Sequence, residues 1–273
     1  MNFGKQLSVG FKGYFKALEL LFSKGFMKYM LFPLLLNILI FWVGMSQITD
    51  LTVTARHAFI DWINLDSTHF FGSEFLKGAL SGLITALIYV LFFISFAYLG
   101  GYIIIIILSP LFSVISEKTE TVLAGHKIDY PFELKQFVKD IFRGTGIALR
   151  NVLFETGVMI SVFIVGLILS FVSWAGVIFM FFISSYFYGF SYMDYSNERY
   201  KRNIKESVSF MRKYKWVAVV NGSLFALVLF IPYVGVALSA FVAVISVIAG
   251  TASMVELKKI EDAETDKLFN TEI

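Results

Sequence analysis

Four long stretches of the sequence contain no charged residue, and their length is the strongest structural signal in the chain. They run over residues 29–49, 78–116, 156–193 and 216–255. A helix needs about 20 consecutive apolar residues to cross the hydrocarbon core of a bilayer. The first window fits one crossing, and the other three hold nearly twice that length. The pattern predicts an all-α polytopic membrane protein with a single membrane domain over the whole chain, residues 1–273.

The third and fourth windows each contain a turn signal near the middle, at residues 170–176 and at residues 231–235. Proline removes a helix donor and glycine permits a reversal, so we predict two helical hairpins, over residues 156–193 and 216–255. Each limb of the first hairpin has about 17 residues, or roughly 25 Å of helix, which barely matches the hydrocarbon thickness. Hairpins that span the bilayer and hemi-penetrating hairpins that enter it only partly are both compatible with this length.

The first two windows predict single membrane helices. We expect a first transmembrane helix over residues 26–49 and a long second one over residues 78–122. The apolar run after the glycine pair Gly100 and Gly101 continues without a turn signal, so we predict a kink there rather than a hairpin tip. Residues 50–77 then form the connection between the two helices.

Two amphipathic segments accompany these windows. In residues 1–24, apolar residues recur at helical spacing while lysines occupy the other side. This pattern predicts an amphipathic helix that either lies in the membrane interface or packs on the protein's own surface. In residues 196–213, a short apolar stripe is surrounded by six lysines and arginines. It predicts a basic surface helix on the cytoplasmic leaflet, where such segments usually serve as lipid anchors.

Composition agrees with this picture and narrows the function classes. Hydrophobic residues make up 58% of the chain and charged residues only 16%, whereas soluble domains are near one half and one quarter. The absence of cysteine excludes disulfides, cysteine nucleophiles and thiolate metal sites. The three histidines have no metal-site spacing, and no Walker-type glycine loop is visible. We therefore expect no enzyme activity, no catalytic or metal-binding residues, no cofactor and no nucleic-acid partner.

The orientation follows from where lysine and arginine lie, because positive residues favour the cytoplasm. Residues 1–28 carry five lysines against one glutamate, and residues 194–215 carry seven lysines and arginines. Residues 50–77, with two basic and four acidic residues, are the poorly basic connection. This distribution predicts an extracytoplasmic connection at 50–77, cytoplasmic termini, and a cytoplasmic tail over residues 256–273.

Several segments resemble one known family, in the right order along most of the chain. They are the run KGFMKYMLFPLLLN at residues 24–37, the SPLF…SEKTE…G segment at 109–125, YMDY at 192–195, and IP at 231–232 followed by AGTA at 249–252. Together they resemble the CysZ-type sulfate permeases, a family that also contains the eukaryotic etoposide-induced membrane proteins.

The resemblance implies two long transmembrane helices, two hemi-penetrating hairpins, a homo-oligomer in the cell inner membrane, and sulfate uptake that feeds cysteine synthesis. The family's sulfate site lies at a Gly-Leu-Arg-Arg turn, which falls here on Gly25, Phe26, Met27 and Lys28. The chain departs from the pattern because methionine and lysine replace the two arginines. A lysine is a point charge and does not reproduce arginine's bidentate fork on an oxyanion.

The residues themselves give this turn two readings. Lys24, Gly25, Phe26 and Lys28 form a candidate anion site, because glycine lets amides converge at a positive helix start that two lysines flank. The alternative, which the sequence alone favours, is a simple break before the first membrane helix, with Lys28 reaching out to the interface. Asn37, inside that helix, is expected to hydrogen-bond a neighbouring helix, or less often to line a pore.

Acidic residues near the window ends are expected to be structural. Glu117, Lys118 and Glu120 close the second helix, where a solvated end is favoured over an ion network with Arg143 or Arg150. Asp194 is expected to cap the basic surface helix. The four windows hold no Asp, Glu, Lys, Arg or His, which argues against a buried proton relay.

Two functions compete on these grounds. The leading hypothesis is a permease that passes a small inorganic anion, sulfate or a relative, through the lipid bilayer. The alternative is a non-transporting membrane organiser or scaffold of the same family, which the missing arginine pair and the shallow hairpins favour.

Overall fold

The computed structural model describes residues 1–23, 25–62, 73–125, 134–168, 173–231 and 234–271, except for some side chains within the helices. Apart from short turns, these residues are helical, and none of them forms a strand. The helices are α1 (Phe3–Ser23), α2 (Lys28–Trp62), α3 (Ser73–Ile107), α4 (Ser109–Ala124), α5 (Leu134–Ile168), α6 (Ser173–Arg199), α7 (Ile204–Lys213), α8 (Lys215–Leu229) and α9 (Val234–Thr271).

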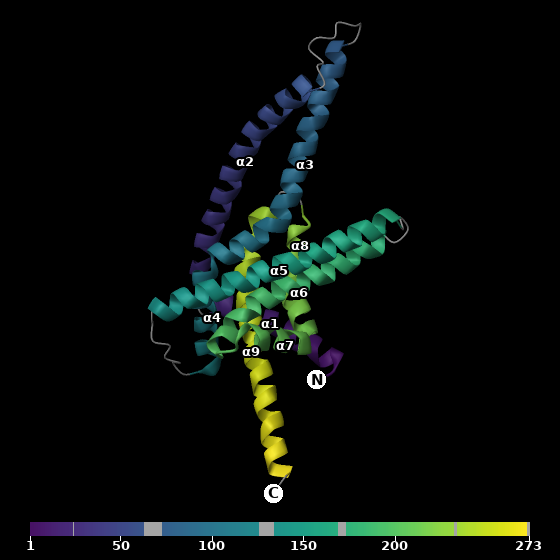
Figure 1. Cartoon of the computed structure of the whole chain (residues 1–273). Helices are drawn as coiled ribbons and strands as arrows, with labels where there is room; N and C mark the ends of the chain where they lie inside the picture. Colours follow the sequence, from purple (N-terminus) through teal and green to yellow (C-terminus); the bar gives the residue numbers. More distant parts are fainter. Residues whose placement is uncertain (24, 63–72, 126–133, 169–172, 232–233, 272–273) are drawn as a thin grey trace.

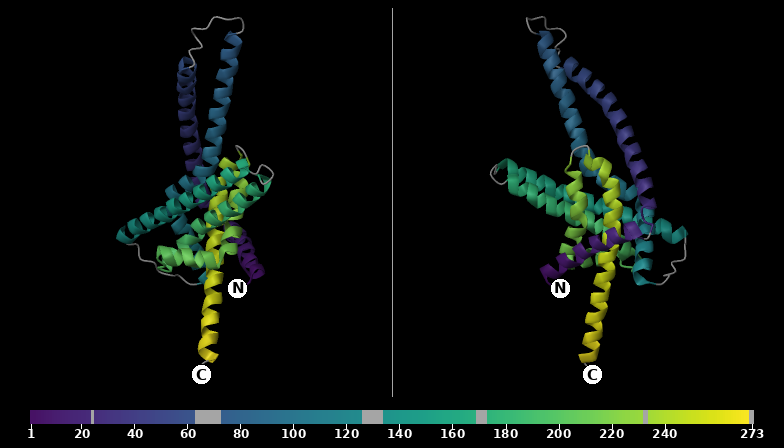
Figure 2. Two further views of the ribbon diagram at one scale, coloured as in Figure 1. Left: turned by 45° about the vertical axis from the view of Figure 1, so that its right-hand side comes forward. Right: turned by 180° about the vertical axis from the view of Figure 1, so that it is seen from behind.

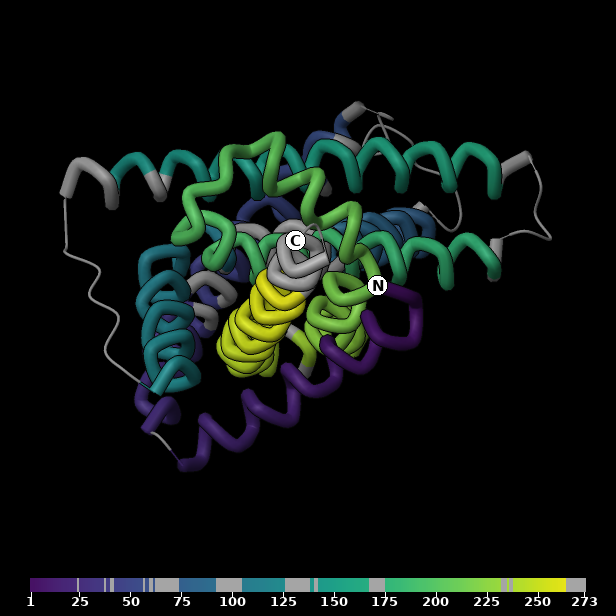
Figure 3. The backbone as a smooth tube through the Cα atoms, turned by 90° about the horizontal axis from the view of Figure 1, so that it is seen from below, coloured from purple at the N-terminus to yellow at the C-terminus, as the bar shows by residue number. Residues whose placement is uncertain are grey.

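The helices form a packed body from which one helix pair and one helix end project (Figure 1). α2 and α3 lie side by side and extend away from the body together, whereas the C-terminal end of α9 leaves it on the opposite side (Figure 2). α5 and α6 lie side by side obliquely across the body. α8 pairs with α9, and both pass behind α5 and α6 in the view of Figure 1. α1 crosses both α8 and α9 (Figure 3).

Four of the described helical segments are long and apolar enough to cross a bilayer: Glu74–Leu91, Phe142–Gly166, Ala175–Arg199 and Leu238–Ala263. They differ in their surroundings. None of the first segment is buried within the protein, whereas 72% of the last is. The α3 segment therefore exposes its apolar surface to lipid, and α9 is the central helix of the body. The expected class, an all-α polytopic membrane protein, is confirmed.

The closest contact in the body is the crossing of α6 and α8, which two glycines make possible. A Cβ atom on Gly189 would lie 1.8 Å from the carbonyl oxygen of Ala218, and one on Gly222 would lie 1.9 Å from that of Ser185. Real side chains do not fit at such distances, so the two backbones touch. Small residues at a helix crossing let the two backbones approach closely, which is a common way to pack helices inside a membrane, where the hydrophobic effect between helices is weak.

The second membrane helix, expected as one element over residues 78–122, is divided into α3 and α4. The break lies at Leu108 and not at the glycine pair, because Gly100 and Gly101 are helical. Pro110 occupies the first turn of α4. It lacks a backbone donor, and its ring crowds the preceding turn, so a new helix starts more easily than the old one continues.

The first membrane helix is longer than expected at its far end. α2 begins at Lys28 and continues past residue 49 to Trp62, and α3 begins at Ser73. Much of the predicted connection at 50–77 is thus helical, with residues 63–72 outside the described part. The predicted tail is likewise helical over residues 256–271, where α9 ends.

Both predicted hairpins are present as antiparallel helix pairs, α5 with α6 and α8 with α9, although the limbs reach well beyond residues 156 and 255. The turn segments 169–172 and 232–233 lie outside the described residues. How deeply the hairpins enter a bilayer stays a prediction.

The basic surface helix expected over 196–213 is corrected to the shorter α7. α6 continues to Arg199, and Lys201 then adopts a left-handed conformation with φ 55°. Asn203 caps α7: its side chain accepts from the Glu206 amide at 3.0 Å, and the Glu206 carboxylate accepts from the Asn203 amide at 2.8 Å. This reciprocal capping box starts a helix at a residue that the sequence prediction overlooked.

Candidate functional site

The turn between α1 and α2 contains the residues of the predicted anion site. Gly25 has φ +69°, a conformation that glycine adopts without strain, and α2 starts at Lys28. The turn is tightened by hydrogen bonds from the Tyr29 amide to the Phe26 carbonyl and from the Met30 amide to the Met27 carbonyl, both 3.0 Å. The positive end of the α2 dipole therefore lies at this turn.

Phe26 anchors the turn in the body and brings it against α4. Its side chain is fully buried, and its ring centroid lies 6.1 Å from that of Tyr29. The Lys118 ammonium of α4 lies 4.7 Å from the Phe26 ring and 5.1 Å from the Tyr29 ring. Lys28 reaches the same Tyr29 ring, at 5.3 Å. Two ammonium groups from distant parts of the sequence thus share the Tyr29 ring.

Lys118 is the residue of this site that the sequence prediction missed. The sequence placed it at the end of the second membrane helix, but nothing in its spacing indicated contact with residues 26–29. Met27, at the position of the family's first arginine, is 52% exposed and adds no charge. Lys118 thus brings to the turn a second positive charge that residues 25–28 alone do not supply.

Two of the other predicted residues are outside what the structure describes. Lys24 belongs to the undescribed positions, and the side chain of Asn37 does as well, although its backbone is part of α2. Whether Lys24 adds a third charge, and whether Asn37 contacts another helix, therefore stay predictions.

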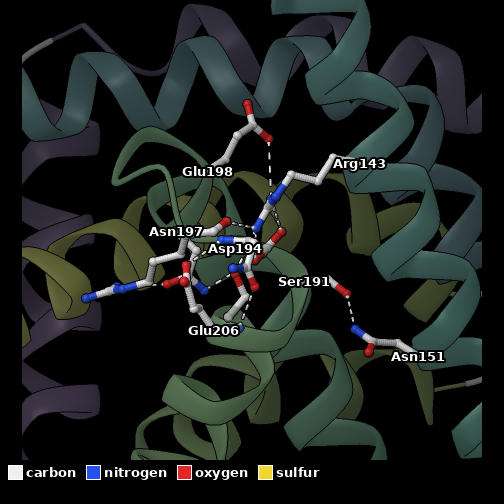
Figure 4. A network of polar contacts seen from close by, with 10 residues as sticks. Arg143, Asn151, Ser191, Asp194, Asn197, Glu198 and Glu206 are labelled. Carbon is white, nitrogen blue, oxygen red and sulfur yellow. Dashed lines mark hydrogen bonds and ion pairs between the residues drawn. The ribbon is translucent and has the colours of Figure 1, made fainter.

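A second polar cluster lies at the base of the first hairpin and centres on Arg143 of α5 (Figure 4). Its guanidinium donates to both carboxylate oxygens of Asp194, at 2.7 and 3.2 Å, and to the Ser207 hydroxyl at 2.8 Å. Asn197 also donates to Asp194, at 3.2 Å. The expected role of Asp194 as a helix cap is therefore wrong: a buried carboxylate needs a cationic partner, and Arg143 supplies it.

The cluster continues from α6 to α9 through Arg202. This arginine donates to Asn197 at 2.9 Å, stacks on the Phe210 ring at 3.9 Å, and reaches the Glu261 carboxylate at 3.4 Å. Glu261 also accepts from Lys213 at 3.0 Å and from Tyr214 at 2.9 Å. The hydrogen bonds of the Lys213 ammonium with Tyr214 and Glu261 raise the pKa of Lys213. α7 is thereby tied to the C-terminal half of α9.

Arg199 forms a second buried ion pair and corrects the expectation of a solvated end for α4. Its guanidinium donates to Glu120 at 2.8 Å and to Ser116 at 2.8 Å, and both charged side chains are about 8% exposed. Ser116 in turn is 2.5 Å from the Thr251 hydroxyl of α9. An ion network, the less favoured alternative for this helix end, is present, but its partner is Arg199 and not Arg143 or Arg150, because α6 extends farther than predicted.

These two clusters differ from the turn in their charge balance. In each ion pair an arginine or lysine faces a carboxylate: Arg143 faces Asp194, Arg199 faces Glu120, and Arg202 with Lys213 faces Glu261. The pairs Arg143–Asp194 and Arg199–Glu120 are buried one-to-one pairs, which hold helices together but offer little net attraction for a free anion. Arg202 and Lys213 share the Glu261 carboxylate nearer the surface. Lys28 and Lys118 instead share the Tyr29 ring at a helix start, which suits an anion.

One carboxylate lies deeper than the charge-free windows suggested. Glu155 is fully buried inside the apolar segment Phe142–Gly166 and accepts a short hydrogen bond from the Ser184 hydroxyl of α6. It lies one residue before the predicted third window. Residues 156–193 therefore contain no charged side chain, but the apolar helical segment Phe142–Gly166 does.

The comparisons with known proteins agree with the motifs described above. Two proteins of Pseudomonas aeruginosa, from strains LESB58 and PAO1, are both named sulfate transporter CysZ. Each is 25% identical to this chain over 226 residues, which cover 80% of this chain and 85% of the relative. A family model described as sulfate transporter CysZ/etoposide-induced protein 2.4 matches residues 14–239. The chain therefore belongs to the sulfate transporter CysZ/etoposide-induced protein 2.4 family.

Proposed function

We propose that this protein is a permease that passes a small inorganic anion, sulfate or a close relative, across the cell inner membrane for cysteine synthesis. The observation that carries the proposal is the convergence of Lys28 and Lys118 on the Tyr29 ring at the start of α2. The family and the names of the relatives support sulfate as the substrate to test first.

The proposed site attracts an anion by charge and by helix polarity. Two ammonium groups and the positive end of α2 favour a doubly negative oxyanion over a neutral molecule. Phe26 and Tyr29 hold the Lys118 ammonium in place by cation–π contact. Because lysines are point charges, the site selects an anion by its charge and size. It does not bind two oxygens at once with a planar fork of donors, as an arginine does.

The orientation and assembly belong to the same proposal. Both termini lie in the cytoplasm, residues 50–77 face the other side, and several copies assemble in the membrane. The charge distribution of the sequence supports the orientation. The apolar segment of α3, in which no residue is buried, supports assembly, since its surface suits a second copy as well as lipid.

The test is radiolabelled sulfate uptake into proteoliposomes that contain the purified protein. We expect uptake above empty vesicles, and a loss of at least tenfold in both Lys28→Ala and Lys118→Ala. Lys205→Ala, an exposed lysine on α7, is the matched control and should transport normally. Uptake equal to empty vesicles, or variants that transport like the parent, would remove the proposal.

A second function is favoured by one observation, the exposed Met27 at the position of an arginine in the family pattern. Without that fork the chain would act as a membrane organiser that does not move anions. Isothermal titration of the purified protein with sulfate, sulfite and phosphate distinguishes the two. Binding of any of them that is lost in Lys28→Ala excludes the organiser.

A further inference from the structure

α1 has three distinct faces, which follow from the helical spacing of its residues. The first face is buried: Gln6, Gly10, Gly13, Ala17 and Leu20 recur every three or four positions and contact the body. The second face is apolar but exposed, with side-chain exposures between 44% and 74%: Phe11, Phe15, Leu18 and Phe22. The third face is basic: Lys5, Lys12 and Lys16. At 3.6 residues per turn these stripes are about a third of a turn apart.

The buried face of α1 packs across both helices of the second hairpin, α8 and α9. The Gln6 side chain donates to the Lys213 carbonyl and accepts from the Trp216 amide, both at 3.2 Å. The Tyr14 hydroxyl donates to the Asn221 carbonyl at 2.6 Å and is 3.3 Å from Ser246 of α9. A Cβ on Gly13 would lie 2.6 Å from the Ala249 carbonyl oxygen, so α1 sits directly on α9. The sequence left a choice between packing on the protein and lying in the interface, and packing is thus confirmed.

The exposed apolar face still needs an occupant, and the lipid bilayer is the one that the surroundings favour. α1 leads through the Gly25 turn into α2, whose exposed Leu31, Phe32 and Leu35 continue the apolar surface within the first two turns. α2 is the predicted first membrane helix, and on this prediction the stripe on α1 meets the same lipid at the level where α2 enters. A helix with such a stripe beside a row of lysines suits the boundary between acyl chains and headgroups.

The basic face specifies the lipid chemistry. Lys5 and Lys12 are exposed, whereas Lys16 is engaged by Glu19 of the same helix at 2.7 Å. Lysines beside an inserted apolar stripe attract anionic phosphate headgroups. We propose that α1 is a lipid-docking strap: its phenylalanine stripe lies in the leaflet, Lys5 and Lys12 bind anionic headgroups, and its buried face clamps α8 to α9. Anionic lipid therefore stabilises the second hairpin. This proposal is independent of what the protein transports.

The depth of α1 tests the insertion. Because the chain has no cysteine, single spin labels at Phe15→Cys and Lys12→Cys report one position each in the full-length protein in bilayers. We expect the label at position 15 to be relaxed by oxygen dissolved in the bilayer, and the label at position 12 by a water-soluble nickel chelate. Equal exposure of both labels to nickel would overturn the proposal. So would a label at position 15 that neither reagent reaches, because a second protein copy would then cover the stripe.

The lipid preference is tested separately, by thermal unfolding in nanodiscs of phosphatidylcholine with and without phosphatidylglycerol. We expect the anionic lipid to raise the unfolding temperature of the parent, and the double variant Lys5→Gln/Lys12→Gln to lose that increment while unfolding normally in phosphatidylcholine. Lys139→Gln, an exposed lysine on α5 outside both amphipathic segments, should keep the increment. No increment in the parent, or an increment that the double variant retains, would refute anionic lipid binding by α1.

Discussion

At the scale of single residues, Met27 is the side chain that separates this turn from the family pattern. An arginine there would add a charged, bidentate donor to a site that now has two point charges. We predict that Met27→Arg tightens sulfate binding about tenfold, equivalent to about 1.4 kcal/mol, measured by isothermal titration. Met27→Leu keeps the shape without the charge and should bind like the parent. An unchanged affinity in Met27→Arg would mean that the anion does not meet this turn.

Asp194 is the residue on which the network of the first hairpin depends. Its side chain is 6% exposed and lies 2.7 Å from Arg143, so Asp194→Asn leaves the buried guanidinium with only the more distant Glu198 carboxylate, at 3.9 Å, as an ion-pair partner among the described residues. Breaking a buried pair in this way costs about 3–5 kcal/mol. We predict a clearly lower unfolding temperature for the detergent-solubilised variant.

The control for this prediction is a solvent-exposed pair. Glu74 is 88% exposed and lies 3.4 Å from Lys77, so Glu74→Gln should leave the unfolding temperature nearly unchanged. Equal effects of the two substitutions would show that the Arg143 pair does not hold the hairpin.

At the scale of helices, the α6–α8 crossing is the contact most sensitive to side-chain size. Gly222→Ala would place a Cβ within 2 Å of the Ser185 backbone, so the two helices must separate. We predict a marked loss of thermal stability, measured in the same detergent assay. Gly157→Ala on α5 is the matched control, because nothing lies within 4 Å of its Cβ position. Since alanine favours helix by about 1 kcal/mol over glycine, this control should unfold at the same or a higher temperature.

At the scale of the whole molecule, the absence of cysteine makes the orientation directly measurable. We predict that Glu74→Cys, at the start of α3, reacts with a membrane-impermeant maleimide added to intact cells. Ser209→Cys, on the exposed face of α7, should react only after the cells are broken. The reverse pattern would invert the topology and place the Lys28–Lys118 site on the outer side.

Some features of this protein were decided by sequence alone, because solvation acts on each segment locally. Long charge-free windows prefer hydrocarbon wherever the rest of the chain lies, so the membrane class and the two hairpins could be predicted. Gly25 could be placed at a turn for a similar reason, since its conformational freedom is a property of the residue itself.

Other features depend on which segments meet, and no local pattern contains that information. Lys118 joins Lys28 only because the break at Leu108 directs α4 toward the start of α2. Asp194 and Glu120 were predicted as a cap and a solvated residue, yet each pairs with an arginine brought near by the packing of α4, α5 and α6. The tertiary structure decides these pairings because the cost of burying a charge depends on the partner that the fold supplies.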